Sequence, residues 1–155
     1  MLTTNLLSYI GVVIMVGVSG LASVYATTIT GNASVAAMKK NPAAFGSYMM
    51  LSALPGSQGL YGFASFFLMK NYITAGMTME QAIAILSIAI LVGVMNLLSA
   101  LRQSQVCTNG IIAVGNGQND VAGKTLVLAV FPELYAILGV ATVFLTLGLM
   151  GTPIV

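Results

Sequence analysis

The chain of 155 residues is 58% hydrophobic and 5% charged, with a net charge of +2 at neutral pH. Soluble domains carry roughly a quarter charged residues, so this composition excludes a water-facing globular surface. Five scattered cations form no basic face, which makes nucleic acid a poor partner. With no histidine and one cysteine, Cys107, an internal disulfide and an ordinary zinc or iron–sulfur site are excluded. Apolar stretches of the length that crosses a bilayer, about 20 residues, predict an integral membrane protein.

The first half of the chain predicts two membrane helices. The first covers about 5–30 and leads into a loop near 32–42. There Asn41 is expected to cap the second helix and Pro42 to stand in its first turn. The second helix is predicted over about 43–72, interrupted at Leu54-Pro55-Gly56.

The second half predicts two more helices. The sequence Thr78-Met79-Glu80-Gln81 fits a capping box that begins a third helix, which runs to about residue 114. The segment 115–120, rich in Gly and Asn, is the clearest turn in the chain. A fourth helix is expected over about 121–150, interrupted at Pro132.

The two halves are related by an internal repeat. Val16-Gly17-Val18 recurs 76 residues later as Val92-Gly93-Val94, and Leu60-Tyr61 recurs 74 residues later as Leu134-Tyr135. A two-helix unit returns to its starting side, so both copies point the same way across the membrane. We therefore expect an all-α integral membrane protein with one domain over 1–155. Its four transmembrane helices would form two parallel-repeated hairpins, about 1–74 and 75–155, in the arrangement of a ring-building unit.

Lysines indicate the orientation in the membrane. Lys39, Lys40 and Lys124 fall in or beside the loops that join the helices within each hairpin, whereas Lys70 lies near the opposite end. The positive-inside rule then places both of these loops in the cytoplasm.

Glu133 is the main candidate for chemistry. It lies 13 residues after Asp120 in an otherwise apolar helix, roughly 20 Å from the loop at about 1.5 Å per residue. A carboxylate at that depth is costly unless it is protonated, paired or bound to a cation. Reversible neutralisation is what an ion carrier needs. The alternative is a structural glutamate that hydrogen-bonds a neighbouring helix.

Prolines occur at similar depths in the second and fourth helices, at Pro55 and Pro132. A proline inside a helix frees a backbone carbonyl about one turn earlier, and such carbonyls can bind a hard cation. A simple packing kink is the alternative. Beside Pro55, the side chains of Ser57 and Gln58 add two oxygen donors. Gly56, Gly59 and Gly62, three residues apart, predict a narrow face on the second helix. Gly59 falls opposite Glu133 in the repeat.

The third helix contributes Arg102, Gln103 and Gln105 near the inferred depth of Glu133. Gln103 is a further oxygen donor, and Gln105 lies about 200° round the helix, too far to serve the same site. Arg102 is expected to face a neighbouring molecule or the interior of a ring, rather than to pair with Glu133 or to extend to the membrane interface.

Two motifs resemble a known family. They are Leu54-Pro55-Gly56-Ser57-Gln58-Gly59-Leu60-Tyr61-Gly62-Phe63 and Glu133-Leu134-Tyr135-Ala136-Ile137-Leu138-Gly139. Together they resemble the four-helix proteolipid subunit (K, or c-type) of bacterial V/A-type rotary ATPases, and most closely the sodium-pumping branch. The resemblance implies a ring of identical copies in a prokaryotic cell membrane. The ring would turn against a stator membrane subunit and meet central-stalk subunits at the cytoplasmic loops.

The same resemblance implies the site residues. Na⁺ would be bound by the Leu54 carbonyl, the Ser57 hydroxyl, the side chains of Gln58 and Gln103, and Glu133, while Tyr61 would hydrogen-bond the glutamate. Ser57 stands where threonine is common in the family, and Arg102 stands where a small residue is expected.

Several readings stay open on the sequence. Five oxygens favour Na⁺, a hard cation, but a proton would need only Glu133 and one hydrogen-bond partner. The chain has no GxxxxGK[ST] motif, so we expect nucleotide chemistry to belong to other subunits. A small self-contained transporter and a structural four-helix membrane protein are the remaining alternatives.

Overall fold

The structure, a computed structural model, describes residues 2–151, and every regular element in that range is helical. Three helices are long: α1 (Leu2–Met38), α4 (Met79–Gly115) and α5 (Val121–Leu149). Between α1 and α4 the chain forms a broken arm. Its pieces are the 3₁₀ turn η1 (Pro42–Ala44), α2 (Phe45–Ala53), the 3₁₀ turn η2 (Leu54–Gly56), α3 (Ser57–Met69) and the 3₁₀ turn η3 (Lys70–Tyr72).

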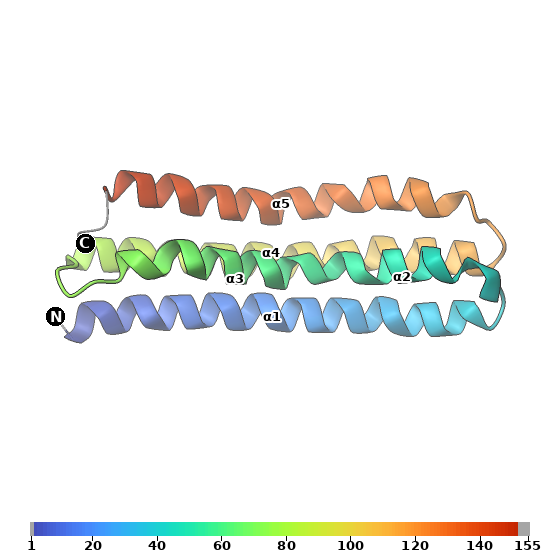
Figure 1. The fold of residues 1–155 in the computed structure, drawn as a ribbon, viewed down its shortest axis with the longest axis horizontal. Coiled ribbons are helices and arrows are strands. Elements are labelled where there is room, and N and C mark those ends of the chain that lie inside the picture. The colour runs from blue at the N-terminus through green and yellow to red at the C-terminus, as the bar shows by residue number, and fades with distance from the viewer. Residues whose placement is uncertain (1, 152–155) are drawn as a thin grey trace.

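The long helices and the broken arm lie side by side as four rods (Figure 1). The start of α1, the link from α3 to α4 and the end of α5 lie at one end of the bundle, and the other two turns lie at the opposite end. Helices α1 and α4 therefore run parallel, and the predicted pair of hairpins pointing the same way is present. Around the bundle, α1 contacts α3 and α4, and α5 also contacts α3 and α4.

Three of the helices are long and apolar enough to cross a membrane: Thr3–Met38, Met79–Gly115 and Val121–Leu149. The 37 residues of α4 extend for about 55 Å, more than the roughly 30 Å of a bilayer's hydrocarbon core. The fourth predicted span is the broken arm. It runs beside α1 in Figure 1, but η2 divides it into two short α-helices of 9 and 13 residues.

The end of the first helix was predicted wrongly. Helix α1 continues to Met38, so most of the expected loop at 32–42 is helical. The cause is tertiary packing: the Ser34 hydroxyl lies 2.6 Å from the Ser52 hydroxyl, and Ala37 packs closely on Gly115. Asn41 stands at the N-cap position of η1 with Pro42 in the first turn, as predicted, but its side chain makes no capping hydrogen bond. Its amide instead donates to the Val114 carbonyl and to Asn119 at 2.9 Å each.

Other boundaries follow the local sequence. The capping box at the start of α4 is present, with Thr78 and Gln81 bonded reciprocally. In the turn between α4 and α5, Gly117 has a φ of +93°, a conformation that favours glycine. The second helix changes to the 3₁₀ turn η3 after Met69, and the helical arm ends at Tyr72, as predicted.

The predicted interruption at Pro132 is also wrong, since α5 continues through it. Proline removes the backbone donor that would bond the Leu128 carbonyl, yet the helix stays continuous. Helix α4 hydrogen-bonds two nearby carbonyls of α5. The Ser99 hydroxyl donates to the Pro132 carbonyl at 2.8 Å, and the Gln103 amide donates to the Ala129 carbonyl at 2.9 Å.

Burial divides the bundle into an apolar, a polar and a second apolar zone. One apolar cluster, centred on Met15, Ile85 and Val92, lies toward the end where α1 begins, and another, around Tyr48 and Ile111, lies toward the opposite loops. Between them are buried polar side chains from three helices: Ser19, Ser23, Gln58, Asn96, Ser99 and Gln103. In a membrane protein these groups need partners inside the bundle, and the candidate site lies among them.

Candidate functional site

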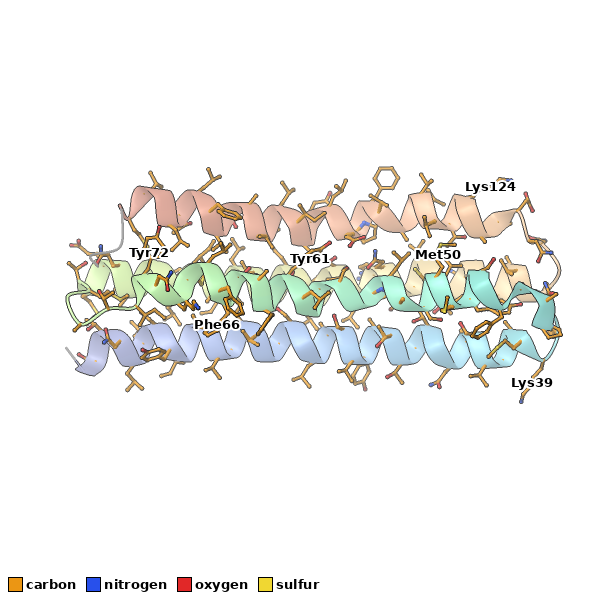
Figure 2. The ribbon with its side chains drawn as sticks, in the orientation of Figure 1. Lys39, Met50, Tyr61, Phe66, Tyr72 and Lys124 are labelled. Carbon is orange, nitrogen blue, oxygen red and sulfur yellow. The ribbon has the colours of Figure 1, made fainter. Side chains whose placement is uncertain are left out.

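The site is built where the broken arm meets α4 and α5. Tyr61, on α3, lies near the middle of the bundle's length (Figure 2). Lys39 and Lys124 lie at the end that holds the α1–η1 and α4–α5 turns, called the loop end below. Tyr61 donates a 2.7 Å hydrogen bond to Oε1 of Glu133 on α5. The carboxylate is thus at mid-length, at the depth that the sequence predicted.

The second carboxylate oxygen of Glu133 is held by α4. Nε2 of Gln103 donates to Oε2 of Glu133 at 3.1 Å and to the Ala129 carbonyl at 2.9 Å. Glu133 itself is partly buried, while the Gln103 side chain is fully buried. Both oxygens of the carboxylate therefore have neutral donors, one from each neighbouring rod.

Gln58 extends the network from α3. Its Nε2 donates to Oε1 of Gln103 at 2.9 Å and to the Ser99 hydroxyl at 3.0 Å. The side chain is fully buried, yet its Oε1 has no hydrogen-bond partner among the described residues. A buried acceptor without a donor costs free energy, on the order of 1–3 kcal/mol, so this oxygen calls for a positively polarised partner.

Leu54 and Ser57 lie at the break of the same arm. The Leu54 carbonyl accepts the Ser57 backbone N–H and, at 3.1 Å, the Ser57 hydroxyl. Gln58 follows directly, so the arm brings these three predicted ligands within one turn of η2 and α3. The bonds of Leu54 and Ser57 stay within the arm, whereas Gln58 reaches α4.

Helix α1 hydrogen-bonds the backbone of the broken arm at η2 and at the start of α3. The Ser23 hydroxyl accepts the Gly59 backbone N–H at 2.7 Å and donates to the Gly56 carbonyl at 3.2 Å. A side chain on Gly59 would approach this hydroxyl to 3.2 Å, and one on Gly62 would collide with Ser19. The narrow face that the glycine spacing predicts is therefore used, and α1 occupies it.

The polar residues of α4 divide as predicted. Gln103 enters the site, and Gln105 instead accepts a 3.2 Å hydrogen bond from Arg102 on the exposed face. The guanidinium of Arg102 thus bonds Gln105 rather than Glu133. Among the described residues, the ion pair present joins Lys124 and Asp120 at the loop end.

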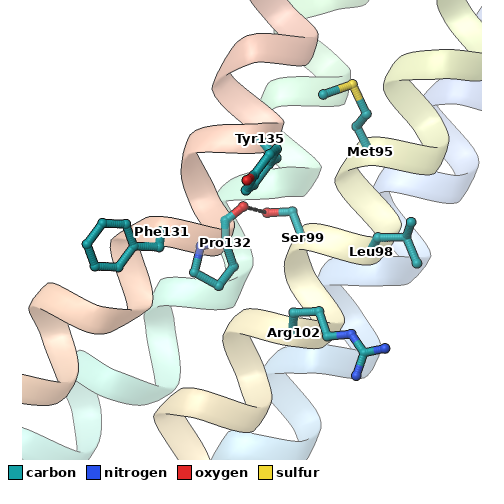
Figure 3. Close-up of a pocket in the computed structure, with 7 residues that line it drawn as sticks. All are labelled: Met95, Leu98, Ser99, Arg102, Phe131, Pro132 and Tyr135. Atoms are coloured by element: carbon teal, nitrogen blue, oxygen red, sulfur yellow. Dashed lines mark hydrogen bonds between the residues drawn. The ribbon is translucent and has the colours of Figure 1, made fainter.

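Arg102 also lines a groove of about 430 Å³ between α4 and α5 (Figure 3). The other lining residues are mostly apolar or aromatic: Met95, Leu98, Ser99, Phe131, Pro132 and Tyr135. A hydrogen bond from Ser99 to the Pro132 carbonyl joins two of these lining residues across the two helices (Figure 3).

Sequence reasoning missed two serines of the site. Ser99 bonds both Gln58 and the Pro132 carbonyl, and Ser23 bonds both sides of the break at η2. A signal was present for each: Ser99 lies four residues before Gln103, on the same face of α4, and Ser23 is its equivalent in the repeat.

Comparison with known proteins identifies the family of the chain. The family model that describes the C subunit of ATP synthase matches twice, over residues 10–69 and 86–146, which supports the internal repeat. The V-type sodium ATPase subunit K of Enterococcus hirae is 33% identical over 127 residues, covering 82% of this chain and 81% of that protein. The A-type ATP synthase subunit K of Methanocaldococcus jannaschii is 32% identical over 142 residues, covering 92% of this chain and 62% of that protein. The chain therefore belongs to the ATP synthase C-subunit family, as a membrane-embedded V/A-type proteolipid subunit of a rotary ATPase.

Proposed function

We propose that this proteolipid transports Na⁺ across the membrane on Glu133, as one of several identical copies in a rotor ring. The cargo ion would be bound by the Leu54 carbonyl, the Ser57 hydroxyl, the amide oxygens of Gln58 and Gln103, and the Glu133 carboxylate. Tyr61 would hold the carboxylate through its 2.7 Å hydrogen bond.

The observation that carries the proposal is Oε1 of Gln58, a fully buried acceptor with no donor among the described residues. Its own Nε2 is bonded to Gln103, which in turn bonds Glu133. Oxygen is the ligand that a hard cation prefers, and a cation here would give the free amide oxygen a partner while neutralising the carboxylate.

The transport cycle follows from this neutralisation. With an ion bound, the site carries no net charge and can pass through lipid as the ring turns. At the stator membrane subunit, a fixed cation would compete for Glu133 and release the ion. Central-stalk subunits would couple the rotation to ATP hydrolysis or synthesis in other subunits, so this chain would not be an enzyme on its own.

We place the ring in the cytoplasmic membrane of a prokaryotic cell, with the loop end in the cytoplasm. Lys39 and Lys124 lie at that end in Figure 2, and Lys40 lies beside Lys39 in the same turn. This distribution follows the positive-inside rule.

A proton is the second candidate cargo. The Tyr61–Glu133 hydrogen bond favours it. A protonated carboxyl is already neutral, so it needs only one such partner to hold its orientation. The proton hypothesis leaves the free oxygen of Gln58 unexplained, which is why we place Na⁺ first.

The test is carbodiimide labelling of Glu133 in the purified protein, followed by mass spectrometry across pH with NaCl or KCl. Only a protonated carboxyl reacts, so bound Na⁺ should slow labelling at a fixed pH, whereas K⁺ should not. Gln58→Leu should remove the protection, and Gln105→Leu, which changes a glutamine bonded outside the site, should keep it. Labelling that depends on pH alone would overturn Na⁺ and make the proton the cargo.

A further inference from the structure

Helix α1 carries none of the five proposed ligands, yet one of its serines bonds the segment that holds three of them. Most serine and threonine hydroxyls inside a helix donate to carbonyls of that same helix. On α1, Thr27 donates to the Ser23 carbonyl and Thr28 to the Val24 carbonyl, at 2.7 Å each. The Ser23 hydroxyl behaves differently, because both of its hydrogen bonds reach the broken arm.

The two bonds of Ser23 are made to the backbone where α3 begins. The N-cap residue of α3 is Gly56, which has no side chain and makes no capping hydrogen bond. The first N–H groups of a helix lack partners within it, and a serine at the N-cap position would bond one two or three residues farther on. The Ser23 hydroxyl accepts the N–H of Gly59, the third residue of α3, at 2.7 Å, and it donates to the Gly56 carbonyl at 3.2 Å. Ser23 therefore caps α3 from a different helix.

The capped turn contains two of the proposed ligands. Ser57 and Gln58 are the residues between the two points at which the Ser23 hydroxyl bonds the backbone. The Gln58 side chain extends from this turn to α4, where its Nε2 donates to Gln103 at 2.9 Å. Oxygens from different helices can bind one ion only if each is held in place. A shift of the turn would move Ser57 and Gln58 relative to Glu133.

Close packing keeps the Ser23 hydroxyl at this turn. Its side chain is 9% exposed, and a Cβ on Gly59 would lie 3.2 Å from its hydroxyl oxygen. A Cβ on Gly62, in the next turn of α3, would collide with Ser19. Small residues at such positions let two membrane helices approach closely. The contact between α1 and the arm thus leaves the hydroxyl little freedom to leave its two backbone partners.

We propose that Ser23 is a positioning residue of the cation site, which holds Ser57 and Gln58 in place by capping α3 from α1. This inference rests on the proposed Na⁺ function and adds to it a residue that does not itself contact the ion. Loss of a group that orients a metal ligand typically lowers metal affinity by about 10–100-fold. The Glu133 carboxylate is held separately, by Tyr61 and Gln103, so the effect of Ser23 should be on the ion and not on the protonation of the carboxylate.

The experiment is carbodiimide labelling of Glu133 in the purified wild type, Ser23→Ala and Ser34→Ala. Two quantities are measured for each protein: the pH of half-maximal labelling without NaCl, and the NaCl concentration that halves labelling at a fixed pH. Ser34→Ala is the matched control. Ser34 also joins α1 to the broken arm, through a 2.6 Å contact with the Ser52 hydroxyl on α2, but it does not touch the turn that holds the ligands.

Ser23→Ala should raise the half-protecting NaCl concentration by about tenfold or more and leave the pH of half-maximal labelling unchanged. Ser34→Ala should change neither quantity. An unchanged half-protecting concentration in Ser23→Ala would overturn the positioning role alone. A shift of both quantities would also overturn it, because Ser23 would then support the fold in general. A wild type that NaCl does not protect would overturn the Na⁺ function itself, and the positioning role with it.

Discussion

The two hairpins share a framework but differ in what they hold at mid-length. In the first, the Ser23 hydroxyl bonds the backbone of the broken arm at Gly56 and Gly59. In the second, the equivalent Ser99 bonds the backbone of α5 at Pro132. Where the second hairpin has Glu133, the first has Gly59, and α1 fills the space beside it. Backbone support by a serine is thus common to both, and the ionisable group belongs to one.

This difference shows how a duplicated unit can specialise. From the first hairpin, the Tyr61 hydroxyl donates to the Glu133 carboxylate of the second, and the Gln58 amide donates to Gln103, which also bonds that carboxylate. Each hairpin alone would hold half of the site. The predictions that follow test this division of roles, from the largest expected effect to the smallest.

The largest effect should come from Glu133→Gln. The amide can keep hydrogen bonds near Tyr61 and Gln103 but cannot change charge, so ion transport should fall to background while the helices stay folded. The measurement is ATP-driven uptake of ²²Na⁺ into vesicles that contain the complete ATPase, with circular dichroism as the folding control. Transport at the wild-type rate would make Glu133 a structural residue.

A second variant asks whether the hairpins are interchangeable. Adding Gly59→Glu to Glu133→Gln moves the carboxylate to the equivalent position of the first hairpin. Transport should not return, because the Gly59 position abuts Ser23 and the repeat equivalent of Gln103 is Thr27, which has no amide. Recovery of even a tenth of wild-type uptake would show that the surrounding amides are dispensable.

A smaller effect is expected from Ser99→Ala. Ser99 positions Gln58, and loss of such a supporting contact typically weakens ion binding by about tenfold or more. The NaCl concentration that half-protects Glu133 from carbodiimide should rise accordingly. Ser99→Thr should restore protection because it keeps the hydroxyl, whereas Ser104→Ala, a buried serine bonded within its own helix, should leave protection unchanged.

The turn of the second hairpin has an ion pair between Lys124 and Asp120. Its effect on the stability of the fold should be the smallest of the four. The hydrogen bond and the charge of Lys124 lower the pKa of Asp120. A lowered folded-state pKa contributes stability above the unfolded value of about 3.9, and this contribution is lost as the pH falls through the folded pKa. Both side chains are about 70% exposed, so the gain should be slight.

The check is thermal unfolding of the wild type and of Asp120→Asn between pH 2 and 7. The wild type should have a slightly higher Tm above about pH 4, and the two curves should meet at the acid end. A difference that persists below the folded pKa would mean that the pair does not act through charge.

Features set by local sequence were predictable, and those set by tertiary contacts were not. The capping box at Thr78 and the break at Pro55 follow from neighbouring residues, and the structure contains both. The continuation of α1 to Met38 depends on packing against Ser52 and Gly115, which lie far away in sequence. The continuity of α5 through Pro132 was likewise not predictable from the proline itself.

The same distinction applies to the candidate site. The depth of Glu133 follows from counting residues, one family motif contains Gln58 and Tyr61, and the resemblance implies Gln103. The free oxygen of Gln58 and the role of Ser99 depend on how α3 and α4 are placed relative to each other. The spacing of Ser99 and Gln103 puts both on one face of α4, but the partners of that face and of the Gln58 oxygen become known only from the structure.

Gly59 has a consequence for energy conversion. With one carboxylate for every two hairpins, a ring built from a given number of helices moves half as many ions in each turn as one with a carboxylate in every hairpin. Each charge that crosses represents about 2.3 kcal/mol per 100 mV of membrane potential. A lower ion-to-ATP ratio lets the same free energy of ATP hydrolysis act against about twice the potential. In the proposed rotor, the absence of a carboxylate at position 59 would therefore suit pumping against a steep gradient better than making ATP from a shallow one.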